Sequence, residues 1–288
     1  MESQGRDAGI ALGPGGGARR VRRRFLIGPL LIALAIVAFK YFTAEEFTNP
    51  ETGETVRVSL SPEQEQALGL QSYQQVLSES RTIDSGPEHD MVVGVARRLI
   101  PVLDERSREF QWHVSLVQSD VPNAFCLPGG KIVVFTGILP ITQNEAGLAT
   151  VMGHEIAHAT ARHGAQRLFQ NDLVQTAMSG VQGSLAEMDP GQQRAILGVL
   201  GAGVQYGLVL PYGRDHESEA DRMGLMYMAR AGFDPTEAIR FWERMEQAGG
   251  AAPPEWASTH PSHGTRIQRL REMMPEAVEE YRRAGARR

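Results

Sequence analysis

AGLATVMGHEIAHATA, residues 146–161, is the stretch that says most about how this chain folds. Apart from two threonines, its residues are all apolar or glycine except His154, Glu155 and His158. A helix that is apolar on nearly every side is buried in the core of its fold. Buried ionisable groups are costly unless they are paired or bound to a metal ion. The three polar residues therefore stand where folding alone would not place them.

The spacing of these polar residues supplies a reason for their burial. His154 and His158 are four residues apart, so both imidazoles lie on one face of a helix, about 5–6 Å apart, within reach of one metal ion. Glu155 is about 100° round the helix from His154, where its carboxylate can take a proton from water beside the ion. The pattern H-E-x-x-H on a helix thus predicts one zinc ion per chain, with His154 and His158 as ligands and Glu155 as the base.

A catalytic zinc site needs a third protein ligand and an open fourth position. A second helix is predicted at residues 214–230, where Glu217 and Asp221 lie one turn apart on a stripe of small residues. This geometry favours Glu217 as the third ligand, with Glu219 as the main competitor. Asp221 would accept a hydrogen bond from the outer nitrogen of a ligating histidine and fix its tautomer.

Two neighbouring histidines predict structural roles. His163 is five residues beyond His158, about 140° round a continuous helix, so it cannot reach the same ion. His216 flanks Glu217 but points off the inner stripe of its helix.

The remaining pattern predicts a few strands followed by many helices. Ser61-Pro62-Glu63-Gln64 starts a helix with a capping box, and Thr142 with Glu145 predicts the same for the helix that carries His154. Helix signals cover 61–79 and 88–100, and strand signals cover 112–117, 123–127 and 131–135. The expected fold class is α+β, mostly helical with a small β-sheet or hairpin.

The N-terminal segment has the pattern of a membrane anchor. Residues 1–24 predict a disordered tail ending in a run of arginines, and the apolar segment 25–44 predicts an uncleaved transmembrane signal anchor. A cleaved signal peptide and a core helix are the alternatives. Residues 45–60 are expected to be a linker, and 61–288 one domain outside the cytoplasm by the positive-inside rule. A further apolar stretch, 195–211, is too short to span and predicts a buried or membrane-facing helix.

Composition excludes several classes of function. A net charge of −5 over 288 residues gives no overall basic footprint for nucleic acid. The single cysteine, Cys126, excludes internal disulfides, zinc ribbons and iron–sulfur sites. With 42% hydrophobic and 22% charged residues, the chain has enough apolar material for a packed core.

Taken together, these motifs resemble the HtpX and CAAX-prenyl-protease family of zinc metallopeptidases, and most closely its branch typified by BepA, LoiP and the Oma-type proteases. The resemblance covers about residues 50–270 and rests on four segments: 154–158, 217–221, 123–132 and His260-Pro261 with Arg266. It implies a zincin-like, gluzincin-type core, a zinc endopeptidase, and Glu217 as the third ligand.

The resemblance also suggests roles for two late residues. His260 would hold the substrate carbonyl or cap the zinc in a resting state. Arg266 would stabilise an oxyanion or pair with an acid. With Glu155 and Asp221, they complete the candidate catalytic residues.

Substrate binding is predicted at a strand edge. Residues 131–135 directly precede the zinc helix, so they can form a strand beside the metal that binds an extended peptide through its backbone. The alternative is that this strand is core with both edges paired. The candidate substrate-binding residues are Asn123, Lys131, Ile132, Val133 and Val134.

The expected function is hydrolysis of unfolded or damaged membrane or envelope proteins in protein quality control. The expected location is a bacterial inner membrane, with the catalytic domain in the periplasm, or a secreted periplasmic form after signal cleavage. A homo-oligomer or envelope assembly partners are further expectations. The alternative is a zinc-stabilised chaperone or assembly factor, against which Glu155 argues because a purely structural zinc site needs no base.

Overall fold

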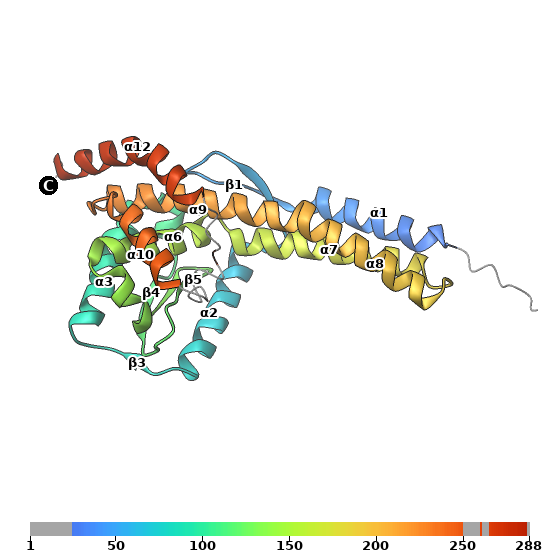
Figure 1. Ribbon diagram of the computed structural model, residues 1–288, viewed down its shortest axis with the longest axis horizontal. Helices are drawn as coiled ribbons and strands as arrows, with labels where there is room; N and C mark the ends of the chain where they lie inside the picture. Colours follow the sequence, from blue (N-terminus) through green and yellow to red (C-terminus); the bar gives the residue numbers. More distant parts are fainter. Residues whose placement is uncertain (1–24, 250–259, 261–264, 287–288) are drawn as a thin grey trace, which may run out of the picture.

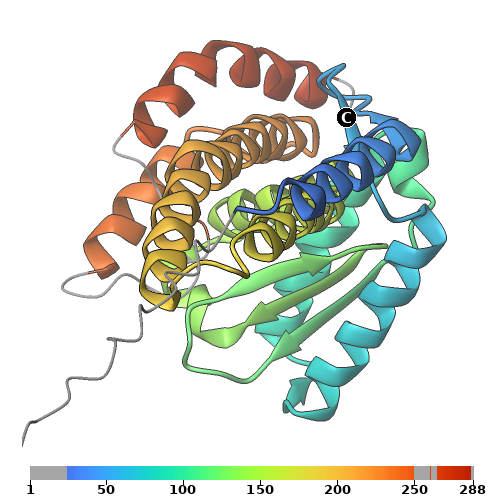
Figure 2. The same cartoon turned by 90° about the vertical axis from the view of Figure 1, so that its right-hand side faces the viewer.

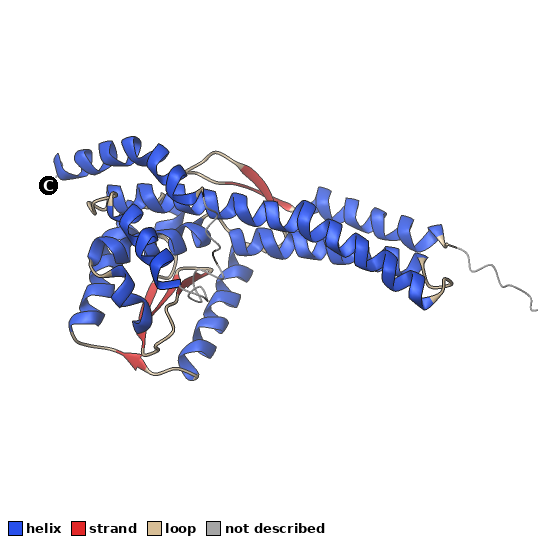
Figure 3. Ribbon diagram, viewed as in Figure 1, coloured by secondary structure: helices blue, strands red, loops and turns tan. Residues whose placement is uncertain are grey.

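The computed structural model, which describes residues 25–249, 260 and 265–286, has two parts: an α+β body and an arm of long helices that extends from it (Figure 1). Helices predominate in both parts, and strands are confined to a small sheet and a separate hairpin (Figure 3). The predicted fold class, a mostly helical α+β domain preceded by an apolar helix, is confirmed.

The sheet of the body has the strand order β3-β4-β6-β5. Its strands are β3 (Thr82–Ile83), β4 (His113–Val117), β5 (Ala124–Leu127) and β6 (Lys131–Phe135). The β4–β6 pair is parallel and the other two pairs are antiparallel. The last three strands lie where the sequence predicts strands.

The position of β6 overturns one prediction. Because β6 lies between β4 and β5, both of its edges are paired, and Lys131, Ile132, Val133 and Val134 are all buried. The prediction that these four residues form a free edge for substrate is therefore wrong, and the core alternative holds. An unbroken apolar run such as Ile132–Val134 is typical of a strand covered on both faces.

Helix α6 (Glu145–Thr160) carries the H-E-x-x-H motif through the core. It is capped by Asn144, whose side-chain oxygen accepts a hydrogen bond from the Gly147 amide. The predicted capping box at Thr142 is wrong, because Thr142 ends the short helix α5 (Leu139–Thr142) and its hydroxyl donates to a carbonyl within that helix.

The main contact of α6 is with helix α9 (Leu210–Arg230). The two helices approach closely where Gly153 faces Gly224, since a Cβ atom at Gly224 would lie 2.8 Å from the His154 amide nitrogen. Glycine is required for this approach because the neighbouring atoms belong to rigid backbone. The crossing brings the polar residues of the two helices together.

Other helices complete the body. The capping box at Ser61 and Gln64 is confirmed. These helices are α2 (Pro62–Ser78), α3 (Pro87–Leu99), α4 (Glu105–Arg108), α10 (Glu237–Gly249) and α12 (Arg266–Ala286), with the 3₁₀ turns η1 (Ile100–Val102) and η2 (Thr136–Ile138).

The segment predicted as a linker instead contains an antiparallel hairpin, β1 (Glu45–Thr48) and β2 (Thr55–Val58). Phe47 and Val58 are buried against Ala165 of the following helical region, which explains why this short, polar stretch is ordered against the rest of the protein. We refer to residues 49–54, which connect the two strands, as the hairpin turn.

The arm is built from α1 (Ile27–Thr43), α7 (His163–Ser184) and α8 (Pro190–Val204), which run side by side (Figures 1 and 2). A π-helical segment, η3 (Gln205–Val209), joins α8 to α9. No residue of α8 is buried, so the expectation of a buried helix at 195–211 is wrong.

None of the helices in the described part of the chain is both long and apolar enough to cross a bilayer. The predicted tail, residues 1–24, lies outside the described residues.

Candidate metal centre

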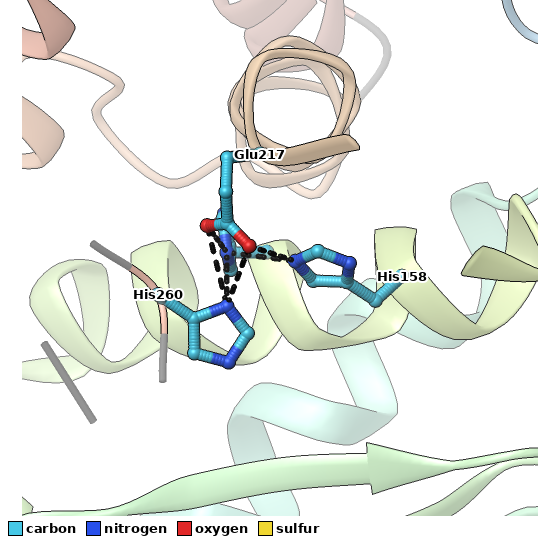
Figure 4. Close-up of side chains that lie close together, drawn as sticks. His158, Glu217 and His260 are labelled. Carbon is cyan, nitrogen blue, oxygen red and sulfur yellow. Dashed lines mark hydrogen bonds and ion pairs between the residues drawn. The ribbon is translucent and has the colours of Figure 1, made fainter. Parts of the chain in front are cut away.

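Four side chains converge where α6 crosses α9. His154 and His158 come from α6, Glu217 from α9, and His260 from the chain that precedes α12 (Figure 4). One potential ligand atom from each of the four lies within 4.8 Å of the other three. The sequence predicts this set, and His260 is the member that spacing alone does not place.

The separations between these atoms fit zinc. His154 Nε2 lies 3.1 Å from His158 Nε2, 3.3 Å from Glu217 Oε2 and 3.3 Å from His260 Nδ1. Glu217 Oε1 lies 3.4 Å from His158 Nε2 and 3.1 Å from His260 Nδ1. Ligands at about 2.0–2.1 Å from a tetrahedral zinc ion are about 3.3–3.4 Å apart. The donor set therefore matches a tetrahedral site with His260 at the fourth corner.

A second layer of charged groups holds two of the four. Asp221 Oδ1 lies 3.0 Å from His154 Nδ1, and Asp221 Oδ2 accepts a 2.7 Å hydrogen bond from Arg266 Nε. Arg266 Nη2 donates at 2.7 Å to Glu217 Oε2, and its guanidinium lies 4.0 Å over the Trp242 ring. Arg266 is only 1% exposed. Of its two predicted roles, pairing with acids is the one for which this arrangement provides contacts.

The electrostatics of the cluster favour metal binding. Burial raises the pKa of Glu217, but hydrogen bonds with His154 and His260 outweigh burial and hold the pKa well below its usual range. Burial lowers the pKa of His154, yet its contacts with Asp221 and Glu217 raise that pKa to about 9. Burial and the neighbouring His154 push the pKa of His158 well below its ordinary value. An ionised carboxylate and a neutral imidazole are the forms that bind metals.

Glu155 lies beside this cluster and is 3% exposed. Its Oε1 atom is 3.4 Å from His260 Nε2, so the same histidine faces both the candidate ligands and the candidate base. Burial raises the pKa of the Cys126 thiol, and the Glu155 carboxylate raises it further. Strand β5, which carries Cys126 and packs against α6, is therefore the strand nearest to this carboxylate among those discussed.

Sequence reasoning missed two histidines that extend the cluster. His163 Nδ1 lies 2.8 Å from His158 Nδ1, and His163 Nε2 lies 3.0 Å from Glu219 Oε2. The ring of His216 stacks on that of His163, with centroids 4.1 Å apart. The prediction assumed one continuous helix, but Arg162 adopts a left-handed conformation (φ 59°) between α6 and α7. This break turns His163 back toward the ligand.

The remaining predicted substrate residues do not face the metal centre through the contacts they make. Asn123 accepts a hydrogen bond from the Ala124 amide with its side chain and one from the Phe135 amide with its carbonyl. The ammonium group of Lys131 donates to the carbonyls of Gln111 and Gly129. Burial lowers the pKa of Lys131. These two residues stabilise the sheet and its turn.

Comparisons with known proteins agree with this geometry. The model of peptidase family M48 matches residues 90–274. The mitochondrial metalloendopeptidase OMA1 of Schizosaccharomyces pombe is 36% identical, over 90% of this chain and 74% of that protein. The human OMA1 is 30% identical, over 90% of this chain and 51% of its own length. The β-barrel assembly-enhancing protease of Escherichia coli is 29% identical, over 93% of this chain and 57% of that protein. The chain thus spans about half the length of several of these relatives.

Proposed function

Because the chain belongs to peptidase family M48 and is a zinc metalloendopeptidase, we propose that it hydrolyses unfolded or damaged membrane or envelope proteins as part of protein quality control. The observation that carries this proposal is the set of four ligand atoms at tetrahedral spacing with the Glu155 carboxylate beside them. The substrate class is our inference, because the relatives' own substrates do not transfer with their sequence similarity.

In this proposal His154, His158 and Glu217 hold the zinc ion. When bound, zinc would supply a Lewis acid that polarises the scissile carbonyl and lowers the pKa of a water molecule. Asp221 would fix the tautomer of His154 through the Nδ1 contact. Arg266 would keep Glu217 and Asp221 in register by bonding to both carboxylates.

Glu155 would act as the general base. Its carboxylate would take a proton from water and later deliver it to the amine of the leaving peptide. His260 Nδ1 occupies the fourth corner of the donor set, and its Nε2 atom faces Glu155. The described arrangement thus supports the capping role predicted for His260, and substrate would enter when this side chain withdraws.

Strand β5 is our candidate for the substrate-binding edge in place of β6. It ends the described sheet, packs against α6, and has β6 on one side only. The Phe135 amide donates to the Asn123 carbonyl, so in the alternating ladder the backbone of Phe125 faces β6 and that of Cys126 faces away. An extended peptide would pair with the outward groups, which demand little of its side chains.

Proline substitutions test this edge. Cys126→Pro removes an outward amide donor, so we expect a melting temperature close to that of the wild type and casein cleavage reduced at least about tenfold. Phe125→Pro is the matched control, because it removes a donor to β6 and should lower the melting temperature. A folded Cys126→Pro variant with full cleavage would place substrate elsewhere.

Membrane attachment through α1 remains part of the proposal. Large apolar side chains are exposed along this helix, including Ile32 at 63%, Phe39 at 69% and Phe42 at 75%. Exposed apolar clusters of this kind mark sites that contact lipid or another protein. A single-pass anchor in a bacterial inner membrane, with the body in the periplasm, is the location we propose.

The rival function is a zinc-stabilised chaperone. A filled fourth corner is common to structural zinc sites, but such a site has no use for a buried carboxylate beside it. The decisive experiment compares casein digestion by the wild type and by Glu155→Gln, each with its zinc content measured. We expect equal zinc and a turnover about 10²–10⁴-fold lower in the variant. Equal digestion by the two proteins would exclude Glu155 as the base.

A further inference from the structure

Two chains of polar contacts lead outward from the α6 histidines. From His154 the contacts run to Asp221 and on to Arg266, within the crossing of α6 and α9. From His158 they run to His163 and then to Glu219. The second chain does not end in the body's core but reaches the N-terminal hairpin, and nothing in the proposed chemistry uses it.

The direction of the hydrogen bonds in the second chain is fixed by its two ends. His158 presents Nε2 to the other ligand atoms, so its proton must reside on Nδ1. A neutral imidazole has one donor and one acceptor, so His163 Nδ1 accepts this proton's hydrogen bond and His163 Nε2 carries a proton. That second proton points at Glu219 Oε2, and an ionised carboxylate only accepts. A single set of tautomers satisfies every contact.

The outer end of the chain is held by the hairpin turn. Glu219 Oε1 accepts hydrogen bonds from Asn49 Nδ2 at 2.6 Å and from Thr52 Oγ1 at 2.9 Å. The same turn carries Glu51, which pairs with Arg230 at the far end of α9 at 2.8 Å. The Glu219 carboxylate is thus oriented by a segment far away in the sequence.

The middle of the chain is enclosed. His163 is 1% exposed, and the His216 ring covers its face with an angle of 9° between the ring planes. His216 in turn contacts Gln166 Oε1 through Nε2 at 3.0 Å. A buried imidazole gripped on its face and at both nitrogens has little freedom to adopt another tautomer or rotamer.

We propose that His163 and Glu219 are positioning residues that fix the tautomer and orientation of His158, and that the hairpin turn tunes zinc affinity through Asn49 and Thr52. This inference rests on the proposed role of His158 as a zinc ligand. Groups that orient ligating histidines typically change metal affinity about 10–100-fold when removed. The N-terminal hairpin would then be part of the metal centre, although it supplies no ligand.

The test measures zinc affinity of the full chain by chelator competition, together with the visible absorption spectrum of the cobalt-substituted protein. His163→Phe keeps a flat ring against His216 but removes both nitrogens, so we expect zinc affinity to fall about 10–100-fold and the cobalt spectrum to shift. Glu219→Ala should weaken zinc binding about tenfold, and Glu219→Gln, which retains an acceptor oxygen, should recover part of the loss.

The hairpin link has its own variants. Thr52→Val keeps the shape of the side chain and removes its hydrogen bond to Glu219, so we expect a zinc affinity about two- to fivefold lower. In the Glu219→Ala background the same change should have no further effect, because the two residues act in one chain. Glu51→Gln is the matched control: it alters the charge of the same turn without touching Glu219, and zinc affinity should stay at the wild-type value.

The outcomes separate this inference from the proposed function. If the apo melting temperature falls in a folded His163→Phe variant while zinc affinity and the cobalt spectrum stay unchanged, the role is structural and the inference is wrong. If His163→Phe does not fold, unchanged affinity in Glu219→Ala overturns it equally. Additive losses in the Thr52 and Glu219 double variant would overturn the hairpin link. A wild type that binds no stoichiometric zinc would overturn the proposed function itself.

Discussion

The metal centre and the arm depart in opposite ways from the usual distribution of residues in a folded protein. Around Glu217 the protein buries charged side chains, whereas along α1 it exposes large apolar ones. Charged groups are rarely buried without a partner, and extended apolar patches are rarely left in water. Each region therefore indicates a partner that is not part of the chain, an ion in one case and an apolar phase in the other.

This contrast indicates where sequence-to-function arguments are strongest. Most of the chain obeys local rules of folding, and the departures from those rules gather at the regions to which we assign function. Removing either departure should cost function while sparing or even improving the stability of the apo fold. The following experiments use this expectation.

The largest effect should come from Glu217→Ala. The change removes a ligand and the carboxylate that balances Arg266, so stoichiometric zinc and casein cleavage should both be lost, as measured by metal analysis and digestion. Loss of metal from Glu219→Ala together with its retention in Glu217→Ala would show that the register of ligands on α9 is wrong.

A smaller effect is expected from Asp221→Asn. The amide is nearly isosteric and can still accept from His154 Nδ1, but it no longer carries the charge that pairs with Arg266. We expect zinc affinity about 10–100-fold lower with reduced cleavage, measured by chelator competition. An unchanged affinity would mean that burial of this acid serves the fold alone.

The arm offers the complementary test. Replacing Ile32 and Phe39 by glutamate should reduce sedimentation with anionic phospholipid vesicles at least about tenfold, because a charge is strongly disfavoured in hydrocarbon. The exposed Leu68 of α2 is the matched position on the body, and Leu68→Glu should leave vesicle binding unchanged. If both proteins bind vesicles like the wild type, the apolar face of the arm serves some other contact.

Local patterns predicted much of this fold. The helix that begins at Pro62, the strands β4 to β6 and the convergence of His154, His158 and Glu217 follow from capping, alternation and helical periodicity. The strand order did not follow, because pairing joins segments distant in sequence. The position of β6 between two strands is a property of the whole sheet, although its uninterrupted apolar run was a usable signal.

The missed contacts of the site have a similar cause. The direction of His163 depends on the left-handed conformation of Arg162, a single residue that ends one helix and starts another. The partners of Glu219 come from a hairpin turn that sequence reasoning expected to be a linker. Periodicity describes faces within one element and carries no information across a break or between elements.

The contact between Gly153 and Gly224 has a consequence for how this metal centre can change over generations. A methyl group at 224 would meet the backbone of α6, which cannot rotate aside as a side chain would. Any descendant that acquires a larger residue there must shift the whole of α9, and Glu217 and Asp221 would move with it. Two residues without functional groups thus restrict the inheritance of the site as firmly as its ligands do. The apolar surface of the arm, which has no such interlock, is free to diverge.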